Sequence, residues 1–303
     1  MEQPNPSACS EIGPDQTDPA AYTFFAPAAE CAVLFSSPHS GRYYPQSFQD
    51  NLRVSLMDLR RVEDAHVDQL IHGVRQLGAG LIKARYARSY VDLNRSETEI
   101  DSRMFLDGAP TPAGERSPRV EAGLGCIPRI AASGENIHAR MLTRKEAEER
   151  LNLAYRPYHA KISESLREIW MRHDQSVLID CHSMPSIVSG KRIHADIVLG
   201  NRHGASCDES LMRLVEREFT RFGYRVLRNM PYAGGYITQK HGMPVEDRHA
   251  LQIEINRKLY LNEANVELKP GFYRLRDDFL SVAQSILKWA EEKSRAMKAR
   301  QKS

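Results

Sequence analysis

Two histidines of this sequence each follow a short apolar run, a position from which a side chain can reach a bound ligand. They are His39 in Ser-Pro-His-Ser-Gly and His182 in Asp-Cys-His-Ser-Met-Pro. Imidazole and carboxylate groups are the ligands of catalytic zinc, which takes three protein ligands and leaves one position for water. Glu63 or Asp64 can supply the third ligand. Because no His-Glu-x-x-His motif is present, spacing alone is a weak signal and does not decide between zinc ligands and two hydrogen-bonded structural histidines.

A lone carboxylate, Glu254, lies between two isoleucines in another apolar run. Burying a carboxylate there is costly unless the group is paired or has a raised pKa. Two interpretations therefore stay open at this stage. Glu254 can form a salt bridge to Arg257 or another arginine, or it can be a general base poised beside a metal-bound water.

Asp180 and Cys181 directly precede His182. Asp180 can orient the histidine from behind, or it can simply end the strand. Cys181 is not favoured as a nucleophile activated by His182, because adjacent residues of an extended strand point to opposite faces.

Three arginines are the candidates for binding an anionic substrate: Arg88, Arg95 and Arg129. Arg95 follows Asn94, and a guanidinium fork beside an amide donor can hold a carboxylate. For each arginine alone, the competing interpretation is an ion pair that fixes a loop.

Short apolar runs alternate with amphipathic stretches along the chain, which predicts an α/β sheet with helices on both faces. Residues 143–146 match a helix capping box, and Pro157 should kink or split the helix that follows. Expected strands lie near residues 31–35, 177–179, 196–199 and 251–253, and expected helices lie near residues 67–77, 144–171, 211–222 and 278–298.

In such sheets the functional groups gather beyond the carboxyl ends of the strands. We therefore expect His39, His182, His203 and Glu254 at those ends.

The composition of the 303 residues, 41% hydrophobic and 27% charged, is that of an ordinary globular protein. A formal net charge of +3 gives no argument for nucleic acid, and no run approaches the ~18 apolar residues of a membrane span. Five scattered cysteines without a C-x-x-C pair fit a reducing cytoplasm.

We expect a disordered tail over residues 1–21, a single catalytic domain over 22–303, and a lid or binding loop over 97–136. The oligomeric state stays open.

Eight stretches in register resemble the N-formylglutamate amidohydrolase family. They include Ser-Ser-Pro-His-Ser-Gly and Tyr-Val-Asp-Leu-Asn-Arg, and they occupy residues 36–45, 63–68, 87–95, 125–129, 180–185, 196–201, 232–236 and 251–260. The resemblance covers nearly everything from about Cys31 to Ala290. That family is similar in turn to the zinc carboxypeptidases and aspartoacylases, which implies a three-layer mixed sheet flanked by helices and one catalytic Zn²⁺.

The resemblance implies a ligand set for the metal. His39 and His182 match two ligands, and an acid of the 63–64 block is the third; we choose Asp64 and keep Glu63 open. One departure explains why the acid must come from elsewhere. Arg42 stands three residues after the first histidine, where the carboxypeptidase pattern has a glutamate.

The resemblance also implies a reaction: hydrolysis of the formamide bond of N-formyl-L-glutamate to formate and L-glutamate, as in histidine degradation. Glu254 is expected to be the general base, and Arg88 to stabilise the developing oxyanion. Asn94, Arg95 and Arg129 are expected to bind the carboxylates of a small-molecule N-acyl amino acid. The alternatives are a zinc hydrolase of another N-formyl or N-acyl amino acid, and a non-catalytic ligand-binding protein on the same scaffold.

Overall fold

The computed structural model describes residues 18–108, 117–188 and 190–300. Over these residues, seven strands form one sheet in the order β1-β3-β2-β4-β9-β7-β8. The strands are β1 Tyr22–Phe25, β2 Val33–Ser37, β3 Gly80–Ala84, β4 Ser176–Met184, β7 Ile197–Gly200, β8 Val226–Arg228 and β9 Arg248–Asn256. Two hairpins stand apart from the sheet: β5 Ile187–Val188 with β6 Lys191–Arg192, and β10 Leu261–Asn262 with β11 Glu267–Leu268.

The sheet is mixed, and its centre is parallel. Strand β2 is parallel to β3 and β4, and β4 is parallel to β9. Strands β1 and β7 reverse this direction, because β1 is antiparallel to β3 and β7 is antiparallel to β9. Every residue of β2 and β4 is buried, as expected for short apolar runs that are covered on both faces.

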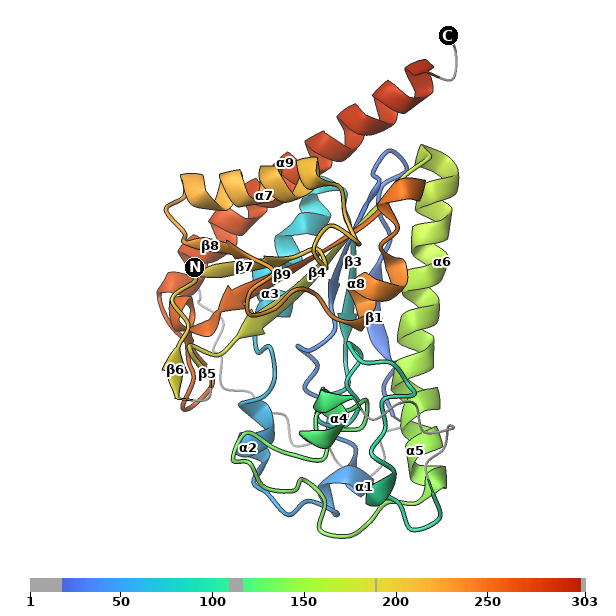
Figure 1. Ribbon diagram of the computed structural model, residues 1–303, viewed down its shortest axis with the longest axis vertical. Helices are drawn as coiled ribbons and strands as arrows, with labels where there is room; N and C mark the ends of the chain where they lie inside the picture. The colour runs from blue at the N-terminus through green and yellow to red at the C-terminus, as the bar shows by residue number, and fades with distance from the viewer. Residues whose placement is uncertain (1–17, 109–116, 189, 301–303) are drawn as a thin grey trace, which may run out of the picture.

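Helices cover both faces of the sheet. Those of the described residues are α1 Gln46–Gln49, α2 Leu56–Arg60, α3 Val67–Leu70, α4 Pro118–Glu121, α5 Arg144–Arg150, α6 Arg156–His173, α7 Glu209–Arg221, α8 Tyr236–His241 and α9 Gly271–Arg300. Figure 1 shows α3, α7 and α9 on one face and α6 and α8 on the other, while α1, α2 and α4 lie together at one end of the molecule. The predicted three-layer α/β arrangement is confirmed.

The long helix expected over residues 144–171 is interrupted where the sequence predicts it. Thr143 forms the capping box with Glu146 that starts α5. A π-helical turn, Leu151–Tyr155, then joins α5 to α6, and Pro157 lies in the first turn of α6. Since proline has no backbone N–H to donate to the preceding turn, the helix changes its hydrogen-bond pattern there instead of continuing.

The expectation that four site candidates lie beyond strand ends is wrong in part. His182 and Glu254 lie within β4 and β9, where they are direct Cα partners. His203 follows β7. Because β7 runs antiparallel to β9, its carboxyl end lies where the amino end of β9 lies, away from Glu254. Of the four, His39 alone follows the end of its strand at the edge where the site forms.

The predicted tail and loop fall partly outside the described residues. Of residues 1–21, only 18–21 are described, and the carbonyl of Ala21 accepts a hydrogen bond from Arg85 N (3.1 Å). Within 97–136, the described part holds α4 and a short 3₁₀ turn, Ser102–Met104, and is otherwise irregular. None of the helices over the described residues has the length and apolarity needed to cross a membrane.

Candidate metal centre

Three side chains from separate parts of the chain meet near the carboxyl ends of the central strands β2 and β4. His39 follows β2, Asp64 lies between α2 and α3, and His182 is part of β4. The atom His182 Nδ1 lies 3.2 Å from His39 Nδ1 and 3.0 Å from Asp64 Oδ2, and the last two are 3.3 Å apart. Ligands about 2.0–2.1 Å from a tetrahedral zinc ion lie about 3.3 Å from one another. The triangle therefore fits a metal ion of this kind, and within the described residues these three make a group able to hold one.

A carboxylate stands behind each histidine. His39 Nε2 lies 2.8 Å from Asp92 Oδ1, and His182 Nε2 lies 2.8 Å from Asp180 Oδ2. Because a carboxylate only accepts, each Nε2 donates and each Nδ1 can present its lone pair to an ion. Asp180 thus orients His182 from behind.

The electrostatics of the cluster favour a bound cation. Burial alone would lower the pKa of His182, but Asp180, Asp64 and Glu254 outweigh it and raise that pKa well above its usual range. Burial alone would raise the pKa of Asp64, but hydrogen bonds from His182 and His39 hold it well below its usual range. A proton at this place is what a metal ion displaces when it binds.

The two acids that the sequence left open point to different surroundings. Asp64 turns Oδ2 to the histidines, while its Oδ1 accepts hydrogen bonds from Arg257 (3.1 Å) and Ser183 Oγ (3.1 Å). Glu63 accepts a hydrogen bond from the hydroxyl of Tyr44 and belongs to a separate buried cluster. The structure therefore brings Asp64, and not Glu63, to the histidines.

Glu254 stands next to the cluster on the neighbouring strand. Its Oε1 accepts a hydrogen bond from Gln252 (2.8 Å). Among the described residues it makes no ion pair, since Arg257 binds Asp64 instead, so the salt bridge considered from the sequence does not form. Burial, reinforced by the charge of Asp64, raises the pKa of Glu254 to about 7, although His182 lowers it. A carboxyl group with such a pKa suits general acid–base chemistry near neutral pH.

Arg88 lies beside the ligand set. Its Nη2 is 2.8 Å from Asp92 Oδ2, and its Nη1 is 3.9 Å from Asp64 Oδ1. The side chain keeps 23% of its surface exposed. Arg88 therefore brings a positive charge to the rim of the cluster.

The three residues expected to bind substrate carboxylates lie in different surroundings. Asn94 Nδ2 is 3.3 Å from His182 Nε2, while its Oδ1 accepts the N–H of Ile237 (2.9 Å) in α8. Arg95 follows it in the chain and, among the described residues, donates to two backbone carbonyls and to no side chain. Arg129 is held by Asp101 in the 97–136 segment (3.1 Å). Asn94 therefore contacts the cluster and Arg95 follows it in the chain, whereas the Arg129 guanidinium forms its ion pair within the 97–136 segment.

Two residues contact the metal-ligand cluster in ways that the sequence did not predict. Asp92 supports His39, and Arg257 supports Asp64. Both lie in stretches that match the family pattern, but nothing local distinguishes them there. Their contacts join residues 53 and 193 positions apart, which only the folded chain reveals.

Comparisons with known proteins identify the family. The sequence profile of the N-formylglutamate amidohydrolase family matches residues 31–261. The chain belongs to this family. The N-formylglutamate deformylase of Pseudomonas putida is 30% identical over 265 residues, which cover 84% of this chain and 89% of that protein. The deformylase of Pseudomonas aeruginosa is 27% identical over 277 residues, which cover 86% and 94%.

Solved structures give the same result. The N-formylglutamate amidohydrolase from Ralstonia eutropha JMP134 matches with a TM-score of 0.85 at 35% identity, covering 90% of this chain and 99% of that one. A gene product from Agrobacterium tumefaciens, at a TM-score of 0.63 and 19% identity, covers 89% and 96% and shares the fold. The family predicted from the sequence is confirmed.

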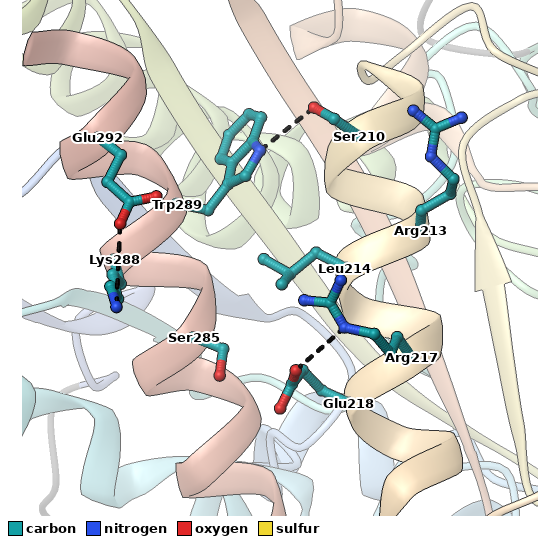
Figure 2. A pocket seen from close by; sticks show the side chains of 9 residues that line it. All are labelled: Ser210, Arg213, Leu214, Arg217, Glu218, Ser285, Lys288, Trp289 and Glu292. Atoms are coloured by element: carbon teal, nitrogen blue, oxygen red, sulfur yellow. Dashed lines mark hydrogen bonds and ion pairs between the residues drawn. The ribbon is translucent and has the colours of Figure 1, made fainter. Parts of the chain in front are cut away.

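This member of the N-formylglutamate amidohydrolase family also has a groove of about 500 Å³ between α7 and α9. In Figure 2, Arg217 faces Glu218 and Lys288 faces Glu292, each pair on one helix, at 3.5 Å and 3.9 Å. The groove includes no residue of the metal-ligand cluster. The groove therefore lies apart from the candidate metal centre.

Proposed function

We propose that this chain is a zinc-dependent hydrolase that cleaves the formamide bond of N-formyl-L-glutamate to formate and L-glutamate. The observation that carries the proposal is the triangle of His39, Asp64 and His182 with Glu254 on the adjacent strand. The family membership and the curated deformylase relatives support the substrate.

The donor set fits zinc, since two imidazoles and one carboxylate leave a fourth position free. Zinc, when bound, supplies Lewis acidity, lowering the pKa of a coordinated water to about 7 and polarising a carbonyl oxygen. Asp92 and Asp180 hold the two imidazoles in the orientation that presents Nδ1. Arg257 and Ser183 hold Asp64 by its other oxygen.

The protein's own groups then account for the proton transfers. The Glu254 carboxylate takes a proton from the attacking water and delivers it to the departing nitrogen. That second transfer is needed because an amide nitrogen leaves poorly without a proton. Arg88, with its positive charge at the rim, stabilises the negative charge that develops on the formyl oxygen. Arg95 positions the substrate by binding one of the substrate's carboxylates.

The test is formate release with controlled metal content. Protein treated with a chelator and then reloaded with zinc should release formate from N-formyl-L-glutamate, and the chelated protein should not. A panel that adds N-formyl-L-aspartate and N-acetyl-L-glutamate, followed by release of the free amino acid, distinguishes specificity for the acyl group from specificity for the amino acid. Zinc-loaded protein that releases no formate from any formyl substrate would contradict the proposal, as would full activity after zinc removal.

A further inference from the structure

Three arginines lead away from the metal cluster with progressively fewer partners. Arg88 forms an ion pair with Asp92 at 2.8 Å. Arg95 donates to two backbone carbonyls, those of Leu124 (3.0 Å) and Asn94 (2.8 Å), and no carboxylate lies within 4.0 Å of it among the described residues. The series ends at an exposed side chain on α4.

That last arginine, Arg119, has no hydrogen bond or ion pair of its side chain to any described residue, and it is exposed. The two outer guanidinium groups therefore make no ion pair with a carboxylate among the described residues.

The backbone holds Arg119 beside Arg95. The carbonyl of Arg119 accepts the N–H of Leu124 (2.8 Å), and the carbonyl of Leu124 accepts Arg95 Nε (3.0 Å). One residue thus links both arginines. Burial lowers the pKa of Arg95, Asp92 opposes this, and Arg119 and Arg88 lower that pKa further, so these like charges are close enough to repel.

The segment that carries α4 is also tied to the wall of the metal centre. Glu99 contacts the chain on both sides of α4. Its side chain accepts a hydrogen bond from the hydroxyl of Ser117 (3.2 Å), the residue that caps α4. Its carbonyl accepts a hydrogen bond from the N–H of Cys126 (2.7 Å). The carbonyl of Cys126 in turn accepts the N–H of Asp92 (2.7 Å). Arg119 is therefore on a short helix fixed relative to the site.

We propose that Arg119 determines specificity by binding the side-chain carboxylate of an acidic N-acyl amino acid whose α-carboxylate is bound by Arg95. The inference rests on the proposed function and adds a residue to it. Two guanidinium groups that have no ion-pair partner among the described residues match the two carboxylates of such a substrate. Arg129, the candidate from the sequence, is less suited because Asp101 already pairs with it.

The test compares an acidic substrate with its neutral isostere. For Arg119→Gln, kcat/KM on N-formyl-L-glutamate should fall by about 10- to 100-fold, the range for a lost charge-assisted hydrogen bond. The value on N-formyl-L-glutamine should stay unchanged, so the preference for the acid disappears. Arg119→Lys keeps the charge and should retain part of the preference.

Arg167→Gln is the matched control, since it removes one positive charge from an exposed position on α6. It should leave both substrates unaffected. Equal losses on the two substrates in Arg119→Gln, or no loss on either, would overturn the inference while leaving the proposed function intact. A wild-type protein that releases no formate from any formyl substrate would overturn both.

Discussion

The metal centre and the groove between α7 and α9 both gather charged side chains, but they do so in opposite ways. In the metal centre, His39, Asp64 and His182 are at most 2% exposed, and their ligand atoms face one another. In the groove, Arg217 and Lys288 are 70% and 76% exposed, and each has an acidic neighbour on its own helix. The ligand atoms of the metal centre converge on one buried point, whereas the charged groups of the groove pair along their own helices, so the metal centre is the better candidate for chemistry.

The physical reason is the dielectric surroundings. Charges in water are screened and interact weakly, so a surface pair contributes little and perturbs no reaction. Buried charges interact strongly and shift one another's pKa values. The contrast between the two regions can be tested by removing one group at a time from each.

The largest effect is expected from His182→Ala. The substitution removes one corner of the ligand triangle, so the protein should lose stoichiometric zinc, and formate release should fall to the assay background. Metal analysis of the purified protein checks this. His203→Ala is the control, because His203 is an exposed histidine after a strand of the opposite direction. It should keep both zinc and activity, and a zinc-loaded, active His182→Ala protein would contradict the assignment.

Asp180→Asn should act more mildly, through the orientation of His182. Losing the carboxylate behind a metal-binding histidine typically weakens metal affinity by about 10- to 100-fold. A competition titration with a zinc chelator measures this independently of turnover. Asp247→Asn serves as the comparison, since it removes a carboxylate that pairs with Lys293 at 2.9 Å. An equal change of zinc affinity in both variants would show a general effect on folding instead.

The pH dependence follows from Glu254. Burial raises its pKa to about 7, and a general base must be unprotonated. Below that pKa a proton occupies the carboxylate, so kcat/KM should fall by about tenfold per pH unit on the acid side and level off above it. A profile of kcat/KM from about pH 5 to about pH 9 measures this. Activity that decreases as the pH rises from about 5 to about 7 would remove Glu254 from this role.

The smallest effect is expected in the groove. Arg217→Gln breaks a surface pair with Glu218, which contributes little in water. Zinc content and kcat/KM should both match the wild type. A tenfold loss of kcat/KM would mean that the groove participates in the reaction, and the comparison between the two regions would fail.

Much of the site could be predicted because its residues stand beside short apolar runs. His39, His182 and Glu254 can be recognised in this way, and the family resemblance implies the roles proposed for them. The choice between Glu63 and Asp64 depended on the loop conformation, which places adjacent side chains in different surroundings. Sequence alone could not settle it.

The reversal of β7 was missed for a similar reason. An apolar run does not record the direction in which its strand enters the sheet, so His203 looked equivalent to His182. The supporting contacts of Asp92 and Arg257 arise only when distant segments pack together.

The most direct test of the central claim is the variant Glu254→Gln, measured for zinc content and for formate release in the same preparation. Glutamine keeps the size of the side chain but cannot take up a proton as a carboxylate does. The account predicts one zinc ion per chain and a kcat that is about 10²- to 10⁴-fold lower. Wild-type turnover in a zinc-loaded Glu254→Gln protein would contradict it.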